Sequence, residues 1–147
     1  MRVVIQRVSR ASVEVEGKIV GKIGRGLLVY VGIEMGDTEK EITFMAEKIL
    51  NLRIFPDDAY KMNFCVKDVG GAILSISQFT LASYIKKGRR PDFINAEEPA
   101  KAEVLYEKFN EILSREIKVE KGVFGVMMNI ESVNNGPVTF IIEKKYK

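Results

Sequence analysis

Four short apolar runs follow one another at the start of the chain, with only two or three residues between them. They extend from Arg2 to Val8, from Ser12 to Val15, from Lys18 to Ile23 and from Leu27 to Ile33. Runs rich in β-branched residues and separated by glycine or serine are typical of β-strands joined by turns. Connections this short leave no room for crossover helices, so we expect an antiparallel meander over the first quarter of the chain.

Two later segments have the period of amphipathic helices. Thr38 and Glu41 form the pattern of a capping box, and an apolar stripe follows it: Ile42, Met45, Ala46, Ile49 and Leu50. The second segment extends from Glu98 to Ser114, has Pro99 in its first turn, and carries the stripe Ala102, Leu105, Phe109 and Ile112. Two helices are too few for a doubly wound parallel sheet. We predict one α+β, β-rich domain over residues 1–147, with a strongly bent, mostly antiparallel sheet or open β-barrel and two helices packed on it.

Shorter patterns complete the expected secondary structure. We predict strands over 53–55, 72–80, 117–121, 124–133 and 138–143, an irregular segment over 59–71, and a frayed tail over 144–147.

The chain contains no histidine, which removes several kinds of catalytic site at once. Ser-His-Asp and Cys-His nucleophile systems, imidazole metal ligands and the usual neutral-pH proton shuttle are all excluded. We expect no metal and no cofactor, so catalysis must rely on backbone dipoles, hydroxyls, carboxylates, lysines or the substrate itself. Cys65, the one cysteine, is interpreted as a small apolar filler that lacks a base to activate it.

The composition also predicts where the protein works. No apolar run approaches the roughly 18 residues of a membrane span, and the first seven residues are too polar for a secretory signal. A single cysteine agrees with a reducing compartment. We therefore expect a cytoplasmic protein without a membrane partner.

The segment from Asn134 to Thr139 lies between two apolar, β-branched runs, which predicts a corner between two strands. Asn-Gly alone would close a tight hairpin, but Pro137 removes a backbone donor and biases Gly136 toward extended geometry. We expect a rigid corner that presents carbonyl groups. A plain turn is the alternative interpretation.

A second unusual segment, from Ser75 to Leu81, places polar side chains at the end of an apolar strand. Buried polar groups cost free energy unless they are hydrogen-bonded, so the segment is either a hydrogen-bonded corner or a functional site.

Together these segments give a resemblance to a known family. Ser77-Gln78-Phe79-Thr80 and Asn134-Asn135-Gly136-Pro137-Val138-Thr139 resemble the two signature motifs of the D-aminoacyl-tRNA deacylases, also known as D-tyrosyl-tRNA(Tyr) deacylases. The resemblance extends from Met1 to about Ile142. It implies hydrolysis of the ester of D-aminoacyl-tRNA, and of glycyl-tRNA mischarged on tRNA(Ala).

The family implies a homodimer in which the Gly136–Pro137 corner of one subunit enters the active site of the other. Its carbonyl groups would hold the substrate's α-amino group, and its backbone would block an L side chain while leaving a D side chain free. Glycine has no side chain to block. The family places Arg7 against the corner, where it would hold the carbonyls; exposure of Arg7 at a sheet edge is the alternative.

For the ester, we expect the main-chain N–H groups of Phe79 and Thr80 to stabilise the oxyanion and Gln78 to position substrate or water. Ser77 completes the motif. A nucleophilic Thr80 lacks an evident activating base, so we favour assistance by the 2′-hydroxyl of the terminal ribose.

Phe124 and Met128 match the positions that hold the terminal adenine in the family. On an extended segment they would share one face, although core packing would explain the same pattern.

Lys86, Lys87, Arg89 and Arg90 place four positive charges within five residues. Subtracting these four from the net charge of +3 leaves −1 for the rest of the chain. A concentrated basic segment is typical of phosphate contact, here with tRNA, although many charge runs are simply solvated loops.

Two functions remain open at this point. One is a deacylase; the other is a non-catalytic protein that binds the aminoacylated 3′ end of tRNA.

Overall fold

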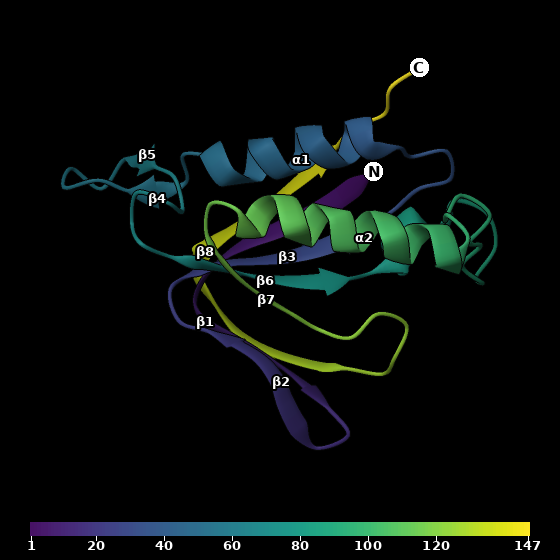
Figure 1. Ribbon diagram of the computed structural model, residues 1–147, viewed down its shortest axis with the longest axis horizontal. Helices are drawn as coiled ribbons and strands as arrows, with labels where there is room; N and C mark the ends of the chain where they lie inside the picture. The colour runs from purple at the N-terminus through teal and green to yellow at the C-terminus, as the bar shows by residue number, and fades with distance from the viewer.

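The computed structural model describes residues 1–147 as a curved sheet covered on one face by two helices (Figure 1). The main sheet has six strands: β1 (Arg2–Val15), β2 (Lys18–Ile23), β3 (Gly26–Gly32), β6 (Ala72–Ser77), β7 (Lys118–Lys121) and β8 (Asn129–Glu143). Their order is β2-β1-β3-β6-β7, and β8 pairs with β1. Strands β4 (Phe55–Pro56) and β5 (Met62–Phe64) form a separate two-stranded sheet.

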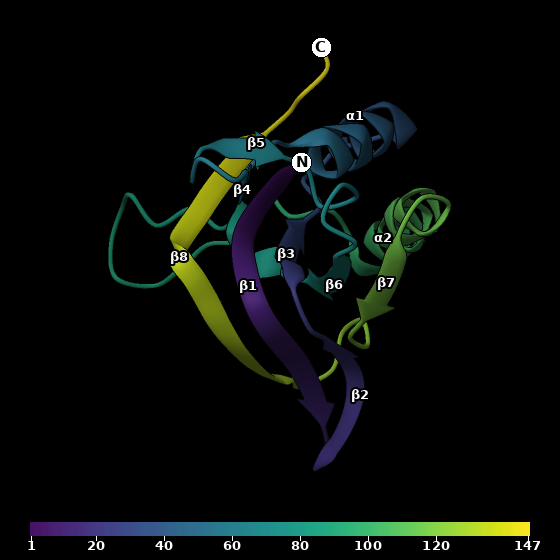
Figure 2. The same ribbon diagram turned by 90° about the vertical axis from the view of Figure 1, so that its left-hand side faces the viewer.

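The long strand β1 gives the sheet its curvature. Its residues 2–8 pair with β3 and its residues 11–15 pair with β2, while β8 follows almost its whole length. Figure 2 shows both long strands bending together. At the far end, β2 curls toward β7, where a Cβ atom on Gly21 would lie 3.0 Å from the carbonyl oxygen of Lys121. The sheet is therefore a nearly closed barrel.

The predicted fold class is confirmed, but the predicted meander is wrong. The segments predicted as strands over 2–8 and 12–15 form one strand, and β1 separates β2 from β3. Two further pairings, β3 with β6 and β6 with β7, are parallel, because the segments that contain the helices carry the chain back across the sheet. All three pairings of β1 are antiparallel.

Helices α1 (Glu39–Asn51) and α2 (Pro99–Ser114) begin where the sequence predicted. Thr38 and Glu41 form the capping box of α1, and Pro99 occupies the first turn of α2. The predicted apolar stripe of α1 is buried in a cluster of 22 residues between helices and sheet, as is that of α2 except for Ile112, which is partly buried. A second apolar cluster lies within the bend of the sheet. Neither helix is long and apolar enough to cross a membrane.

Three predicted boundaries differ from the structure. Strand β6 ends at Ser77 and gives way to a 3-10 helix, η1 (Phe79–Ala82), where we predicted strand through Thr80. Residues 124–128 form a turn and loop instead of the start of a strand. The segment 59–71, predicted to be irregular, contains β5. In each place a local turn or a distant partner decides the conformation, and neither is visible in side-chain alternation.

The four residues after β8 form no helix or strand, but they contact buried groups of the body. Tyr146 N–H donates to Glu41 at 2.9 Å, and Lys145 Nζ lies 3.3 Å from the Asp37 carboxylate. Both carboxylates are buried, Asp37 fully and Glu41 with 1% of its surface exposed. Buried carboxylates need hydrogen-bond partners, and the tail supplies some of them.

Candidate active site

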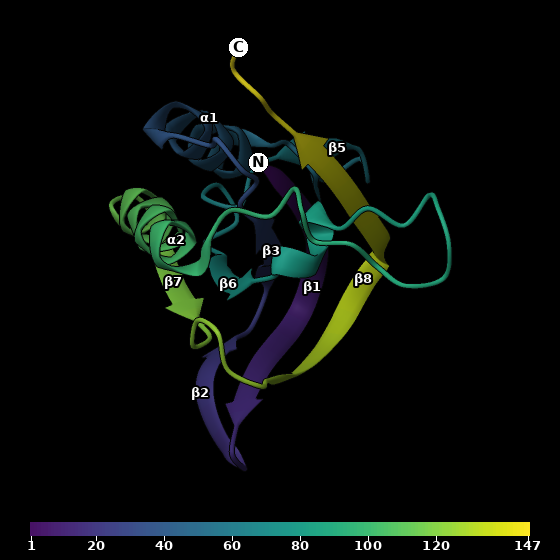
Figure 3. The same cartoon turned by 90° about the vertical axis from the view of Figure 1, so that its right-hand side faces the viewer.

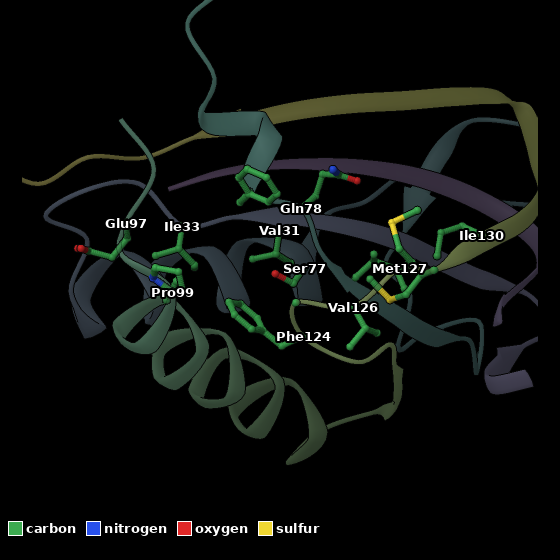
Figure 4. A pocket seen from close by; sticks show the side chains of 15 residues that line it. Val31, Ile33, Ser77, Gln78, Glu97, Pro99, Phe124, Val126, Met127 and Ile130 are labelled. Atoms are coloured by element: carbon green, nitrogen blue, oxygen red, sulfur yellow. The ribbon is translucent and has the colours of Figure 1, made fainter. Parts of the chain in front are cut away.

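A pocket of about 620 Å³ lies beyond the carboxyl ends of β3 and β6. Figure 4 shows the side chains that line it. Ten of its 15 lining residues are hydrophobic, as in most sites for small organic groups. It brings together two segments that the sequence predicted to act together: Ser77, Gln78 and Phe79 from one, and Phe124 and Met128 from the other. Sequence reasoning did not identify the other lining residues, which include Val31, Ile33, Glu97, Val126, Met127 and Ile130.

The turn after β6 carries the Ser-Gln-Phe-Thr motif. The N–H of Gln78 extends the sheet by donating to Val31 O at 2.7 Å, and the first turn of η1 closes when Leu81 N–H donates to Gln78 O at 3.2 Å. The N–H groups of Phe79 and Thr80 precede that bond, so they have no intrahelical partner. They are chemically suited to bind an oxygen of a ligand.

The turn packs closely against β3 at Gly32. A Cβ atom at Gly32 would lie 2.8 Å from Leu81 Cβ and 3.3 Å from Gln78 O. Arg2 holds the other end of the turn, because its Nη1 donates to Leu81 O at 3.1 Å. Close approach of β3 to η1 therefore fixes the direction of the two free N–H groups.

The Thr80 side chain is exposed and does not line the pocket. Its hydroxyl oxygen accepts a hydrogen bond from Gln78 Nε2. Because an amide N–H is a donor and not a base, this contact orients the Thr80 hydroxyl without activating it.

The segment from Phe124 to Met128 reaches the pocket by a route that we did not predict. Gly125 has a φ of +76°, so the segment turns and is not extended. Phe124 packs against Tyr106, with ring centroids 6.0 Å apart. Met128 packs against Gly122, where a Cβ atom would lie 2.5 Å from the thioether sulfur. Both predicted side chains line the pocket, but a turn brings them there and not a shared strand face.

Tyr106 supports the pocket from behind, because its ring packs against Phe124. Its hydroxyl donates to Ser75 O at 2.8 Å in a buried position, and burial raises the pKa of its phenol. The side chain of Asn110, one turn further along α2, is buried beside it without a hydrogen-bond partner. Sequence analysis predicted a site role for neither residue, because a tyrosine on the apolar face of a helix is typical of a protein core.

Glu97 borders the pocket as a fixed carboxylate. Lys101, then the N–H groups of Glu98 and Gly36, donate to it and lower its pKa to about 2. With its oxygens occupied, Glu97 ties the start of α2 to the loop after β3 and is not a proton acceptor near neutral pH.

The Asn134–Thr139 corner is a bend within β8 and not, as predicted, a junction between two strands. Thr139 lies opposite Gln6 and Asn134 opposite Val8, so four residues of β8 face Arg7 alone, as in an enlarged β-bulge. The Gly136–Pro137 peptide bond is cis. Asn134 braces the bend by accepting from Val138 N–H at 3.1 Å and donating to Thr139 Oγ1 at 3.0 Å.

Arg7 lies against this corner. Its Nε donates to Asn135 O at 3.2 Å and its Nη1 donates to Ile54 O at 2.8 Å. The guanidinium thus links the corner to the segment before β4, and Arg7 is half-buried and not a free edge residue.

The corner does not reach the pocket of its own chain. Gly136 and Pro137 are exposed and are not among the lining residues. In Figure 1 the bend of β8 lies at the left of the molecule, whereas the loop between η1 and α2 lies at the right.

That loop contains the basic residues. Tyr84 and Asp92 exchange backbone hydrogen bonds of 2.7 and 3.0 Å, which close a loop over residues 85–91. Lys86, Lys87, Arg89 and Arg90 are all exposed, line no part of the pocket and form no ion pair. Figure 3 shows the loop projecting from the body of the protein.

Comparison with known proteins supplies a family. The family model for D-Tyr-tRNA(Tyr) deacylase matches residues 4–143. A D-aminoacyl-tRNA deacylase of Bacillus velezensis is 52% identical over 146 residues, covering 99% of both chains. One of Brevibacillus brevis is 55% identical over 144 residues, covering 97% of this chain and 99% of that one.

Solved structures agree in fold. One described as c-Myc DNA Unwinding Element Binding Protein has a TM-score of 0.94 at 42% identity, covering 99% of this chain and 100% of its own. Another, a probable eukaryotic D-amino acid tRNA deacylase, has a TM-score of 0.82 at 19% identity and covers 96% of this chain and 97% of its own, so it supports the fold alone.

Proposed function

Since the chain belongs to the D-Tyr-tRNA(Tyr) deacylase family and is thereby a hydrolase of D-aminoacyl-tRNA, we propose that it releases both D-amino acids and glycine from mischarged tRNA, with glycyl-tRNA(Ala) among its substrates. One observation carries this proposal: a single pocket combines the Ser77–Phe79 turn with Phe124 and Met128. The first segment can bind an ester oxygen, and the second can bind an adenine.

The protein promotes cleavage of the ester by positioning the substrate and the attacking water, and it supplies no strong nucleophile of its own. The N–H groups of Phe79 and Thr80 stabilise the oxyanion that forms when water attacks the carbonyl carbon, a contribution of about 3 kcal/mol for each donor. The bond to the ribose 3′-oxygen then breaks, the proton released by the attacking water passes to that oxygen, and the neighbouring 2′-hydroxyl donates a hydrogen bond to it as it leaves. Support for this mechanism comes from Thr80, whose only side-chain partner is the Gln78 amide donor.

Chiral selection falls to the exposed Gly136–Pro137 corner of a partner subunit. Its carbonyl groups hold the substrate's α-amino group, and its backbone excludes an L side chain, so discrimination arises by blocking the wrong substrate. Arg7 supports this assignment because its contact with Asn135 holds the corner in place. The corner's distance from the pocket of its own chain favours a partner's pocket as its target.

A homodimer also suits the free edge of β8. This 15-residue strand pairs only with β1, and it exposes Val133, Phe140 and Ile141. A long exposed edge with apolar side chains is typical of a surface that another chain covers. The dimer would work in the cytoplasm, where aminoacyl-tRNA is made and used.

The basic loop binds the phosphates of tRNA. Four exposed cations without carboxylate partners retain their full charge for a polyanion, and such contacts weaken steeply as salt concentration rises. Simple binding of the charged 3′ end, without cleavage, is the second candidate function, because the same loop and adenine site would serve it.

The decisive experiment measures release of amino acid from D-tyrosyl-, glycyl- and L-tyrosyl-tRNA, with wild type and Thr80→Ala in parallel. We expect rapid release from the first two only, and retention of most activity in Thr80→Ala. Substrates that end in 2′-deoxyadenosine should react slowly. Binding without release would favour the 3′-end binder, and loss of activity in Thr80→Ala with normal cleavage of the deoxy substrate would favour a Thr80 nucleophile.

A mixed dimer tests whether the corner acts in its own subunit or in the partner subunit. One subunit carries Gly136→Val, which damages the corner, and the other carries Gln78→Ala, which damages the turn. If the corner acts in the partner, the mixed dimer contains one intact site and recovers D-selective activity that neither parent dimer has. No recovery would show that each corner serves its own chain.

A further inference from the structure

Two exposed aromatic rings lie side by side at the mouth of the pocket. Phe79 and Phe93 have ring centroids 5.1 Å apart and planes tilted by 58°. Phe79 is 56% exposed and Phe93 is 42% exposed. Burying two phenyl rings would be favourable, and their joint exposure beside a binding pocket marks a surface that a ligand can cover.

Hydrogen bonds fix the backbone around Phe93, so the position from which its ring extends is defined. The Tyr84–Asp92 pair precedes it, and the Asp92 carboxylate accepts from Ile94 N–H at 2.8 Å. Phe93 O accepts from Ala96 N–H at 3.0 Å. Because this backbone is already ordered and a phenyl side chain has only two rotatable bonds, stacking of a ligand on the ring costs little entropy.

The two rings lie between the pocket and the basic loop. Phe79 lines the pocket that contains Phe124 and Met128, whereas Phe93 lies outside the pocket on the segment that follows the basic loop. From the pocket outward, the surface therefore offers a cavity for one base, an aromatic pair, and exposed cations. A single nucleic-acid strand presents its groups in the same order: a last base, a preceding base and flanking phosphates.

We infer that the Phe79–Phe93 pair is a stacking platform for the base of the nucleotide that precedes the terminal adenosine of the substrate RNA. The inference rests on the proposed function, because it takes the terminal adenosine to occupy the pocket. Aromatic stacking accepts any base, which suits a protein that must act on many tRNAs. The four exposed cations of the neighbouring loop, which have no carboxylate partners, favour a polyanion as the ligand that covers the rings.

Three D-tyrosyl esters that share the terminal adenosine test this inference. The first is the ester of adenosine itself, the second carries a 5′ abasic ribose phosphate, and the third carries a 5′ cytidine phosphate. In wild type we expect kcat/KM for the cytidine substrate to exceed that for the abasic substrate by about 10-fold, because only the former has a base to stack. The difference between abasic ester and adenosine ester reports the phosphate.

Phe93→Ala and Phe93→Leu should sharply reduce the difference between the cytidine and abasic substrates, since each removes one of the two aromatic faces and leaves only Phe79. Ile94→Ala is the matched control, because Ile94 is 68% exposed on the same segment and has no ring; it should retain the difference. Fluorescence of 2-aminopurine in place of the cytosine, on a non-hydrolysable amide, should be quenched more strongly by wild type than by Phe93→Ala.

Three results would overturn the inference. Equal rates for cytidine and abasic substrates in wild type would show that no base uses the platform. An equal loss on all three substrates in Phe93→Ala would make Phe93 a support for Phe79. Dissociation of a dimer by Phe93→Ala would show that a second chain covers the rings. Failure of the proposed function differs from all three, because wild type would then cleave none of the esters.

Discussion

At the scale of single residues, Arg7 and Gly122 act through the groups that they contact and do not themselves react with the substrate. Arg7 links Asn135 O to Ile54 O, which joins the corner to the body of the protein. Gly122 leaves the space that the Met128 thioether fills. Both roles predict specific kinetic changes.

Replacement of Arg7 by alanine should relax chiral selection. It removes two N–H donors and leaves the Asn135 and Ile54 carbonyls without them, at a cost of about 1–3 kcal/mol in stability. With the corner less firmly held, the preference for D- over L-tyrosyl-tRNA should fall by at least about 10-fold, a loss of about 1.4 kcal/mol in discrimination.

The measurement is the ratio of kcat/KM values for the two esters, which does not depend on the folded fraction. Arg10→Ala is the control, because Arg10 is an exposed arginine on the same strand. An unchanged ratio in Arg7→Ala would show that the corner needs no support from Arg7.

Replacement of Gly122 by alanine should weaken substrate binding. The new methyl group would overlap the Met128 sulfur, which must move within the proposed adenine site. Because a thioether side chain is flexible, we expect a several-fold rise in KM with little loss of thermal stability. Steady-state kinetics together with a melting curve would check this; a large fall in melting temperature with unchanged KM would contradict it.

At the scale of elements, the site depends on how closely β3 approaches η1. The strand contributes no side chain to this contact, because Gly32 has none, and Leu81 Cβ packs directly over it. The turn that carries the Phe79 and Thr80 N–H groups is thus positioned by β3, a strand that is distant in sequence.

Gly32→Ala should therefore lower kcat. The Cβ atom would force Leu81 and the Gln78 carbonyl away, and displacement of oxyanion donors by even 1 Å costs about 10- to 100-fold in rate. Gly24→Ala is the matched control, since a Cβ atom at Gly24 meets nothing within 4 Å. A normal kcat in folded Gly32→Ala would mean that the turn does not hold the reacting oxygen.

At the scale of the whole molecule, the two ends of the chain and the start of α1 form one buried polar cluster. The amino group of Met1 lies 2.8 Å from the Asp37 carboxylate, with both groups fully buried. Burial opposes ionisation of Glu41, but hydrogen bonds from Tyr146 N–H and from Thr38 outweigh it and lower its pKa to about 2.

This cluster predicts acid sensitivity. The pKa of Glu41 is lower in the folded protein than its ordinary value of 4.5, so its contribution to stability is complete above pH 4.5 and is lost as pH falls toward 2. Urea unfolding between pH 7 and pH 2 should show this loss. Glu41→Gln should reduce the slope between pH 4.5 and 2, leaving the part due to Glu97.

Truncation after Glu143 tests the contribution of the tail. It removes the Tyr146 donor, so the Glu41 pKa should rise toward 4.5 and the stability lost between pH 4.5 and pH 2 should become smaller. An identical pH profile in the truncated protein would show that the tail contact contributes nothing to Glu41.

Much of this protein could be predicted from its sequence. Helix starts at Thr38 and Pro99 follow from capping and from the fixed φ of proline, and strands follow from alternation, because these preferences act within one turn or one strand. The motif residues were identified by their order, and the structure brings Ser77, Gln78, Phe79, Phe124 and Met128 to one pocket.

Only the tertiary structure decided the rest. It joined the two halves of β1 and of β8 into single strands, made β6 parallel to its neighbours, and placed the Gly136–Pro137 corner away from the pocket of its own chain. It also gave roles to Gly32 and Tyr106, which have no local signature. The physical reason is common to all of these: pairing, close approach and burial depend on which distant segment lies alongside, whereas the local sequence determines only the shape each segment prefers.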